Sequence, residues 1–216
     1  MIRMIAFDFD GTIADTIPIC IEAFNNAVSP YVGHKLTKQE IIKTFGLNEI
    51  GMVKAVVKDK WEPALDDFYF YYEKLHDKCM EPFPQIVGLI KFLKEKNIIV
   101  ALITGKGQIS CDISLKKLNL EKYFSEIMVG DERYLNKADS ILKLIKKYAV
   151  KVDEFYYVGD AVSDVTACKE AGVICLSAAW SESVDLEKLK IINPGFIYYD
   201  IDTLKDFFRN IIFESS

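Results

Sequence analysis

Residues 3–12 read Arg-Met-Ile-Ala-Phe-Asp-Phe-Asp-Gly-Thr, an apolar run that ends in two acids and a glycine. A short apolar run bounded by a turn signal predicts a buried β-strand, here over residues 3–9. Asp8 and Asp10 stand two positions apart at the end of that strand, and Gly11 after them can adopt a positive φ. Because two acids are a costly choice for a plain turn after a buried strand, this stretch predicts a sheet with a site at its edge.

Runs of the same kind recur along the chain. They lie at residues 98–104, 126–130, 154–159 and 173–177, with 196–199 as a candidate sixth. Segments of helical period lie between them, at 86–96, 109–118 and 140–148. Strands that alternate with helices favour a parallel sheet covered on both faces. The sequence therefore predicts an α/β fold, a Rossmann-like three-layer core with a parallel sheet.

The interval 16–83 departs from this alternation. It holds no clear strand but four helical patterns, at residues 19–29, 37–45, 49–60 and 63–80. Pro18 stands near its entry and Glu81-Pro82-Phe83-Pro84 at its exit, and the fixed φ of proline marks both places as linkers. We expect residues 1–15 and 84–216 to form the core, and residues 16–83 to form an inserted all-helical domain.

The composition excludes several classes of protein. The chain has 216 residues and a net charge of −5, and only three of its 27 basic residues are arginine, which does not suit nucleic-acid binding. Its five cysteines contain no C-x-x-C pair, which argues against a disulfide framework or a zinc site. No apolar stretch approaches the roughly 18 residues of a membrane span. We expect a cytoplasmic protein that binds neither nucleic acid nor membrane.

Polar residues follow three of the predicted strands, at the edge where parallel α/β sheets bind ligands. Asp8 and Asp10 end the first strand, and Thr104-Gly105-Lys106 ends the second. The fourth strand leads into residues 159–164, Gly-Asp-Ala-Val-Ser-Asp, which place two more acids around a turn into a helix. Lys137 precedes the helix that leads to the fourth strand. Strands that lie side by side would bring these residues into one pocket.

Such a pocket would hold four carboxylates, from Asp8, Asp10, Asp160 and Asp164. Two unit charges about 4 Å apart repel each other by roughly 4 kcal/mol at an effective dielectric constant near 20, so the group requires a bound positive charge. Oxygen ligands suit a hard divalent cation, and Mg²⁺ favours a few carboxylates together with a substrate phosphate. We therefore expect a Mg²⁺ site, with Lys137 supplying one further positive charge.

This combination of motifs resembles the haloacid dehalogenase superfamily of phosphohydrolases. The resemblance is to the subgroup with a helical, C1-type cap inserted after the first strand, and in particular to phosphoglycolate phosphatases. It spans nearly the whole chain and rests on D-x-D-G-T at 8–12, Asp15-Thr16, Thr104, Lys137 and G-D-x-x-x-D at 159–164. The family usually places a proline after the lysine, where this chain has Ala138.

The resemblance implies a role for each motif residue. Asp8 would attack phosphorus and form an aspartyl-phosphate, and Asp10 would act as the acid and then as the base. Thr104 and Lys137 would contact the phosphoryl group and complete the catalytic set. The metal ligands would be Asp8, Asp10 (through its backbone carbonyl), Asp160 and Asp164. The substrate-binding residues would be Gly11, Thr12, Gly105 and Lys106, although Lys106 is equally well explained as an ordinary exposed lysine.

The implied activity is Mg²⁺-dependent hydrolysis of a small phosphorylated metabolite, in the manner of phosphoglycolate phosphatases. Two enzymatic alternatives stay open, a phosphosugar mutase of the β-phosphoglucomutase kind and an inorganic pyrophosphatase. A phosphoaspartate receiver or another binding module is the non-enzymatic alternative. The chain would act as a monomer or a homodimer.

Substrate specificity is expected to lie on the inserted helical domain, which we call the cap (residues 16–83). Its most loop-like part is 45–51, the candidate segment for substrate discrimination. The cap contains eight lysines but no arginine. It therefore cannot offer a bidentate guanidinium clamp to a substrate carboxylate or to a second phosphate, which weakens the case for phosphoglycolate as the substrate.

Overall fold

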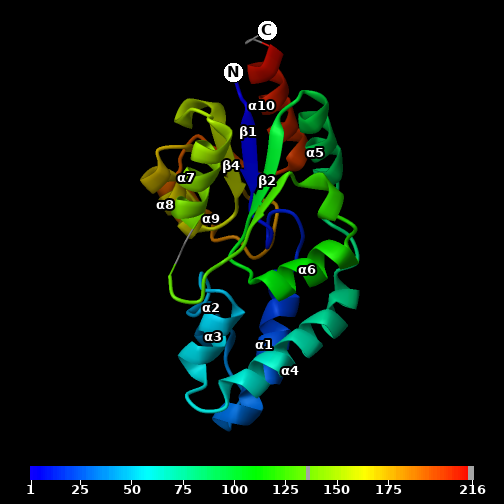
Figure 1. Cartoon of the computed structure of the whole chain (residues 1–216), viewed down its shortest axis with the longest axis vertical. Helices are drawn as coiled ribbons and strands as arrows, with labels where there is room; N and C mark the ends of the chain where they lie inside the picture. Colours follow the sequence, from blue (N-terminus) through cyan, green and yellow to red (C-terminus); the bar gives the residue numbers. More distant parts are fainter. Residues whose placement is uncertain (135–136, 214–216) are drawn as a thin grey trace.

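The computed structural model describes residues 1–134 and 137–213, and Figure 1 shows the arrangement of its elements. The strands are β1 Met4–Phe7, β2 Ile99–Ile103, β3 Glu126–Met128, β4 Phe155–Gly159, β5 Ile174–Ala178 and β6 Ile197–Tyr198. The first five α-helices are α1 Ile17–Val32, α2 Lys38–Ile42, α3 Glu49–Val56, α4 Trp61–Leu75 and α5 Ile86–Glu95. The later ones are α6 Gln108–Lys117, α7 Lys137–Tyr148, α8 Val162–Ala171, α9 Leu186–Ile192 and α10 Ile201–Phe213. Short 3₁₀ turns occupy His76–Lys78, Glu121–Tyr123 and Val152–Glu154.

The strands form one parallel sheet in the order β3-β2-β1-β4-β5-β6. This confirms the predicted α/β fold, including the sixth strand. In the register of the sheet, Phe7 of β1 lies beside Leu102 of β2 and Val158 of β4. Because these three strands end almost level with one another, the polar residues that follow them leave the sheet at the same edge.

The two faces of the sheet contribute to two separate apolar clusters, because successive side chains of a strand point in opposite directions. Ile5 and Phe7 of β1 belong to the cluster that includes residues of α5 and α10, whereas Met4 and Ala6 belong to the cluster with α7 and α8. Figure 1 shows α5 and α10 on one side of the sheet and α7 to α9 on the other. The sheet is thus the middle layer of three.

Helices α1 to α4 lie beyond the carboxyl ends of the strands, below the sheet in Figure 1. Helix α1 begins with Pro18 in its first turn and ends at Gly33, which has a φ of 79°. It packs along α4, where the ring of Phe24 meets the edge of Phe68 at 6.2 Å between centroids. The apolar residues buried between these helices continue the cluster on the α5 side of the sheet, so the cap packs directly on the core.

Three cap helices are shorter than the sequence predicts, and one of them is α4, which ends at Leu75 rather than 80 and is followed by the 3₁₀ turn His76–Lys78. Helix α2 begins at a capping box, in which Thr37 and Glu40 bond each other's backbone N–H groups. Helix α2 stops at Ile42, whereas the sequence predicts an end at 45. The Thr44 hydroxyl donates a hydrogen bond to the Ile41 carbonyl and so competes with the backbone N–H groups that would continue the helix. Helix α3 ends at Val56 rather than 60, because Val57 turns inward in an extended conformation.

None of the helices in residues 1–134 and 137–213 has both the length and the apolar character that crossing a bilayer requires.

Candidate active site

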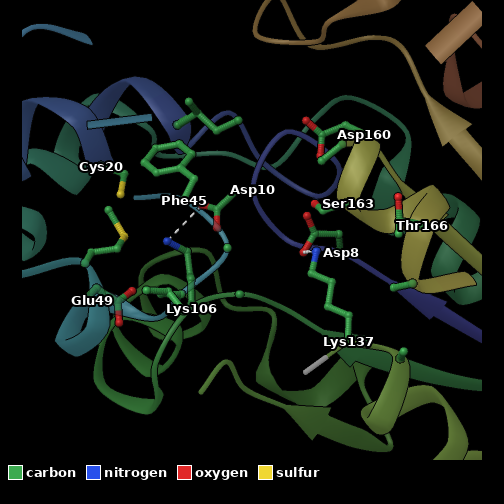
Figure 2. A pocket seen from close by; sticks show the side chains of 18 of the residues that line it. Asp8, Asp10, Cys20, Phe45, Glu49, Lys106, Lys137, Asp160, Ser163 and Thr166 are labelled. Atoms are coloured by element: carbon green, nitrogen blue, oxygen red, sulfur yellow. Dashed lines mark ion pairs between the residues drawn. The ribbon is translucent and has the colours of Figure 1, made fainter. Parts of the chain in front are cut away.

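Three loops at the carboxyl edge of the sheet place the predicted site residues. Asp8 follows β1 directly and is fixed by its backbone N–H, which donates to the Val158 carbonyl at 2.8 Å. Asp160 follows β4, and Asp164 lies in the first turn of α8. Lys137 is the first residue of α7. Figure 2 shows the side chains of Asp8, Lys137 and Asp160 on one side of a common pocket.

The carboxylates of Asp8, Asp160 and Asp164 form a compact buried group. One oxygen from each lies within 4.8 Å of the others. Asp8 Oδ1 is buried, and the Lys137 ammonium forms an ion pair with it at 2.9 Å. Three buried carboxylates gathered around one point form a donor set that suits Mg²⁺. The side chain of Asp10 is not part of this group.

Lys137 bridges two of the acids. Its ammonium lies 2.9 Å from Asp8 Oδ1 and 2.5 Å from Asp164 Oδ1. Asp164 is fully buried and also accepts a hydrogen bond from the Ala161 backbone N–H at 3.0 Å. The Tyr157 hydroxyl lies 3.2 Å from the same Asp164 carboxylate. These contacts hold the Lys137 ammonium between the carboxylates of Asp8 and Asp164.

Asp8 and Asp160 resist ionisation together. Burial, opposed by Lys137 and reinforced by Asp164 and Asp10, raises the pKa of Asp8 from 3.8 to about 7. Burial is the main cause that raises the pKa of Asp160 well above its ordinary value, and the negative charges of Asp8 and Asp164 raise it further. Burial alone would lower the pKa of Lys137, but the two carboxylates outweigh it and keep the pKa raised. A divalent cation would relieve this cost by stabilising the ionised carboxylates.

Asp10 faces a second lysine. The Lys106 ammonium lies 2.9 Å from Asp10 Oδ1 and 4.4 Å from the centre of the Tyr72 ring of the cap. The Thr16 hydroxyl donates a hydrogen bond to the same Asp10 oxygen. Lys106 is only 4% exposed and is therefore not an ordinary surface lysine, although it still lines the pocket. The sequence left its role open, and the structure places it against Asp10.

Gly11 allows the loop after β1 and the loop after β4 to approach each other. It has a φ of +76°, and a Cβ atom added to it would lie 2.3 Å from Asp160 Oδ2. The neighbouring Thr12 is fully buried, and its hydroxyl donates to Asp160 Oδ1 at 3.4 Å. Both residues therefore touch Asp160, and neither is among the described residues that line the pocket.

A Gly11→Ala variant is expected to lose more stability than a Gly33→Ala variant. Both glycines have positive φ, which costs an L-residue roughly 1–2 kcal/mol, but nothing lies within 4 Å of a Cβ at Gly33. Only the change at Gly11 also displaces Asp160. Urea unfolding of both variants measures the difference, and equal losses would contradict the close approach.

The loop after β2 supplies the remaining predicted residues. Thr104 is buried, its Oγ1 accepts a hydrogen bond from the Lys106 backbone N–H at 3.2 Å, and it is not among the described residues that line the pocket. Gly105 does line the pocket. The predicted contact of Thr104 with a phosphoryl group therefore stays a prediction.

The cap completes the pocket, which encloses about 360 Å³. Phe45, Gly46 and Leu47 line it, and they belong to the segment 45–51 that the sequence singles out for substrate discrimination. Glu49 of the same segment also lines it, but the sequence assigns it no role of its own, because an acid in the first turn of a helix is an ordinary helix-start signal. Ser163 and Thr166 of α8, also not predicted, line the opposite wall. Glu170 of the same helix, which was not predicted either, lines the pocket as well.

Comparison with known proteins places these features in context. A family model described as haloacid dehalogenase-like hydrolase matches residues 5–178. A protein of Caldanaerobacter subterraneus provisionally named pyrophosphatase PpaX is 31% identical over 203 residues, 93% of this chain and 91% of its own length. A protein of Neisseria meningitidis named phosphoglycolate phosphatase is 29% identical over 189 residues, 82% of this chain and 79% of its own length.

The solved structures agree on the fold. A crystal structure of a predicted phosphoglycolate phosphatase from Haemophilus somnus superimposes with a TM-score of 0.80 at 20% identity, covering 94% of this chain and 97% of the other. A predicted phosphatase from Clostridium acetobutylicum gives a TM-score of 0.79 at 17% identity, covering 97% and 99%.

Proposed function

Since this chain belongs to the haloacid dehalogenase-like hydrolase family, we propose that it is a Mg²⁺-dependent phosphatase that hydrolyses a small phosphate monoester through an aspartyl-phosphate on Asp8. The observation that carries the proposal is the buried group of Asp8, Asp160 and Asp164 beside Lys137. A nucleophile, a set of oxygen donors and a fixed cation then meet at one point of the pocket. Relatives named as phosphatases support the same reaction class.

The metal site follows from the donor set. Asp8 and Asp160 would hold Mg²⁺, together with the backbone carbonyl of Asp10, and Asp164 would act as a further ligand or would fix Lys137. Bound Mg²⁺ supplies a Lewis acid that draws negative charge from the phosphoryl oxygens. Lys137 adds a fixed positive charge next to the attacking oxygen, where it stabilises charge that develops in the transition state.

The proposed reaction uses Asp8 and Asp10, the two acids of the loop after β1, in turn. An Asp8 oxygen forms a bond to phosphorus as the bond to the leaving oxygen breaks, and Asp10 gives that oxygen its proton. Water then attacks the phosphorus of the aspartyl-phosphate and gives a proton to Asp10, which releases inorganic phosphate and the Asp8 carboxylate. Lys106 and Thr16 both contact Asp10 Oδ1, which leaves Oδ2 for the proton transfer.

A pyrophosphatase is the second candidate function, because relatives with that name align with nearly the whole chain. The reaction would use the same residues, with phosphate in place of an alcohol as the leaving group. A panel of phosphorylated metabolites and pyrophosphate, compared by kcat/KM, separates the two candidates.

The metal requirement provides the direct test of the proposed function. We expect 4-nitrophenyl phosphate hydrolysis to stop in EDTA and to return with Mg²⁺. An Asp160→Asn variant should need at least about 10- to 100-fold more Mg²⁺ for half-maximal activity, since it removes a ligand. Asp153→Asn is the matched control, because Asp153 is exposed just before the other end of β4. Hydrolysis that persists in EDTA, or equal Mg²⁺ requirements in both variants, would contradict the proposed site.

A further inference from the structure

Glu49 of the cap reaches across to the core. It begins α3 and is only 3% exposed. Its Oε2 accepts a hydrogen bond from the Gly107 backbone N–H at 2.8 Å, and its Oε1 accepts one from the Ser110 hydroxyl. Both donors lie at the start of α6, where the helix dipole also favours an anion. The carboxylate is therefore fixed at the wall of the pocket.

The contacts around Glu49 keep it there. The preceding Asn48 donates from its side chain to the Gly130 carbonyl at 3.1 Å and from its backbone to the Asp131 carbonyl at 3.0 Å. Lys54 of the same helix pairs with Glu132 at 2.6 Å. The start of α3 is thus fastened to the loops after both β2 and β3, and Glu49 cannot leave the pocket without the cap opening.

The cap contributes no positive charge to the described lining of the pocket. Apart from Glu49, the cap side chains that line it are Ile17, Cys20, Phe45, Leu47 and Met52. None of the eight cap lysines lines the pocket within the described residues. Lys106 and Lys137 are the cations in the described lining, and both already pair with carboxylates.

The described lining of the pocket holds more carboxylates than ammonium groups. Five carboxylates and two ammonium groups line it in the described part of the chain. A bound divalent cation and Lys137 would attend the phosphoryl group itself, and Glu49 is the charged side chain that the cap contributes to the described lining. Figure 2 shows Glu49 across the pocket from Asp160 and Lys137.

We propose that Glu49 is a specificity-determining residue that selects phosphate esters whose leaving group bears no second negative charge. This inference rests on the proposed function and narrows it. The favoured substrate is a monoester with an uncharged leaving group that packs on the apolar cap wall. Phosphoglycolate and pyrophosphate, which both carry a second anionic group, would be poor substrates of this chain although relatives are named for them.

Two aryl phosphates of the same shape test the proposal. In 4-carbamoylphenyl phosphate and 4-carboxyphenyl phosphate, an amide and a carboxylate differ in charge but hardly in size. We expect the wild type to prefer the neutral ester by about tenfold or more in kcat/KM, because a second charge several ångströms from Glu49 is repelled by at least about 1.4 kcal/mol. A Glu49→Gln variant, whose amide oxygen can accept from the Gly107 N–H and whose amide nitrogen can donate to Ser110 Oγ, should bring this ratio close to one. Glu62→Gln, an exposed cap variant outside the pocket, should leave it unchanged.

Other results of the same experiment would contradict the proposed role of Glu49. Equal use of the two esters by the wild type, or preference for the carboxylate, would overturn the proposal. The proposal would also be overturned if Glu49→Gln lowered kcat/KM for both esters equally and left their ratio unchanged. That result would show that Glu49 only holds the cap against the core. If neither ester were hydrolysed, the proposed function would fail, and the binding ratio of the two corresponding arylphosphonates by calorimetry would still decide on Glu49.

Discussion

An Asp8→Asn variant is expected to hydrolyse phosphate esters at least about ten-thousand-fold more slowly than the wild type, because an amide oxygen cannot replace the attacking carboxylate. The loss should appear in kcat for every ester, including activated aryl esters, since no leaving group removes the need for the nucleophile. Steady-state kinetics at saturating Mg²⁺ measures it. A variant that retained a tenth of the activity would exclude a covalent intermediate on Asp8.

The fold of this variant serves as its own control. Because the folded-state pKa of Asp8 is raised from 3.8 to about 7, the folded protein holds a proton that the unfolded chain releases in this range. Without metal, the free energy of unfolding of the wild type should therefore fall as the pH rises from 3.8 to about 7. Asp8→Asn should lack this part of the pH dependence and should be at least as stable as the wild type at neutral pH. Urea unfolding in EDTA at several pH values checks both statements.

An Asp10→Asn variant is expected to show a loss that depends on the leaving group. A poor leaving group such as an alkoxide needs the proton that Asp10 supplies, so hydrolysis of an alkyl phosphate should slow by about 10²- to 10⁴-fold. 4-Nitrophenolate leaves without a proton, so formation of the phosphorylated enzyme from 4-nitrophenyl phosphate should slow much less. Rapid mixing should then show a burst of 4-nitrophenolate, because the variant lacks the base for the second step.

Two results would contradict this role for Asp10. One is an equal loss of the first step for both esters, which would indicate that Asp10 positions the substrate without transferring a proton. The other is unchanged hydrolysis of the alkyl ester. The Asn side chain can still accept a hydrogen bond from Lys106 and Thr16, which hold the native side chain, so a displaced loop is not the expected cause of a loss.

The fold and the acidic part of the site could be predicted because local patterns determine them. Asp8 and Asp160 each follow a short apolar run, and strands of a parallel sheet carry their ends to one edge. Once Phe7 lies beside Val158, the residues after them have to meet. The sequence marks the end of each strand clearly, and the parallel sheet then brings these ends to one edge.

The contacts between the cap and the core could not be predicted in the same way. The contact of Tyr72 with Lys106, and that of Glu49 with Gly107, join residues far apart in the sequence that share no periodic pattern. They depend on how α3 and α4 sit over the sheet. Nothing local distinguishes Glu49 from any other acid at a helix start, and burial is what gives it a role. The ends of α2 and α3 were mispredicted for a related reason, because local hydrogen bonds and an inward-facing Val57 end each helix early.

The most direct test of the account is to identify the residue that carries the phosphoryl group. The Asp10→Asn variant, mixed with 4-nitrophenyl phosphate and Mg²⁺ and quenched in acid, should accumulate phosphorylated enzyme. Peptide mass mapping is expected to place the phosphoryl group on Asp8. A phosphoryl group on any other residue, or 4-nitrophenolate release in a burst without a phosphorylated peptide, would contradict the proposed mechanism.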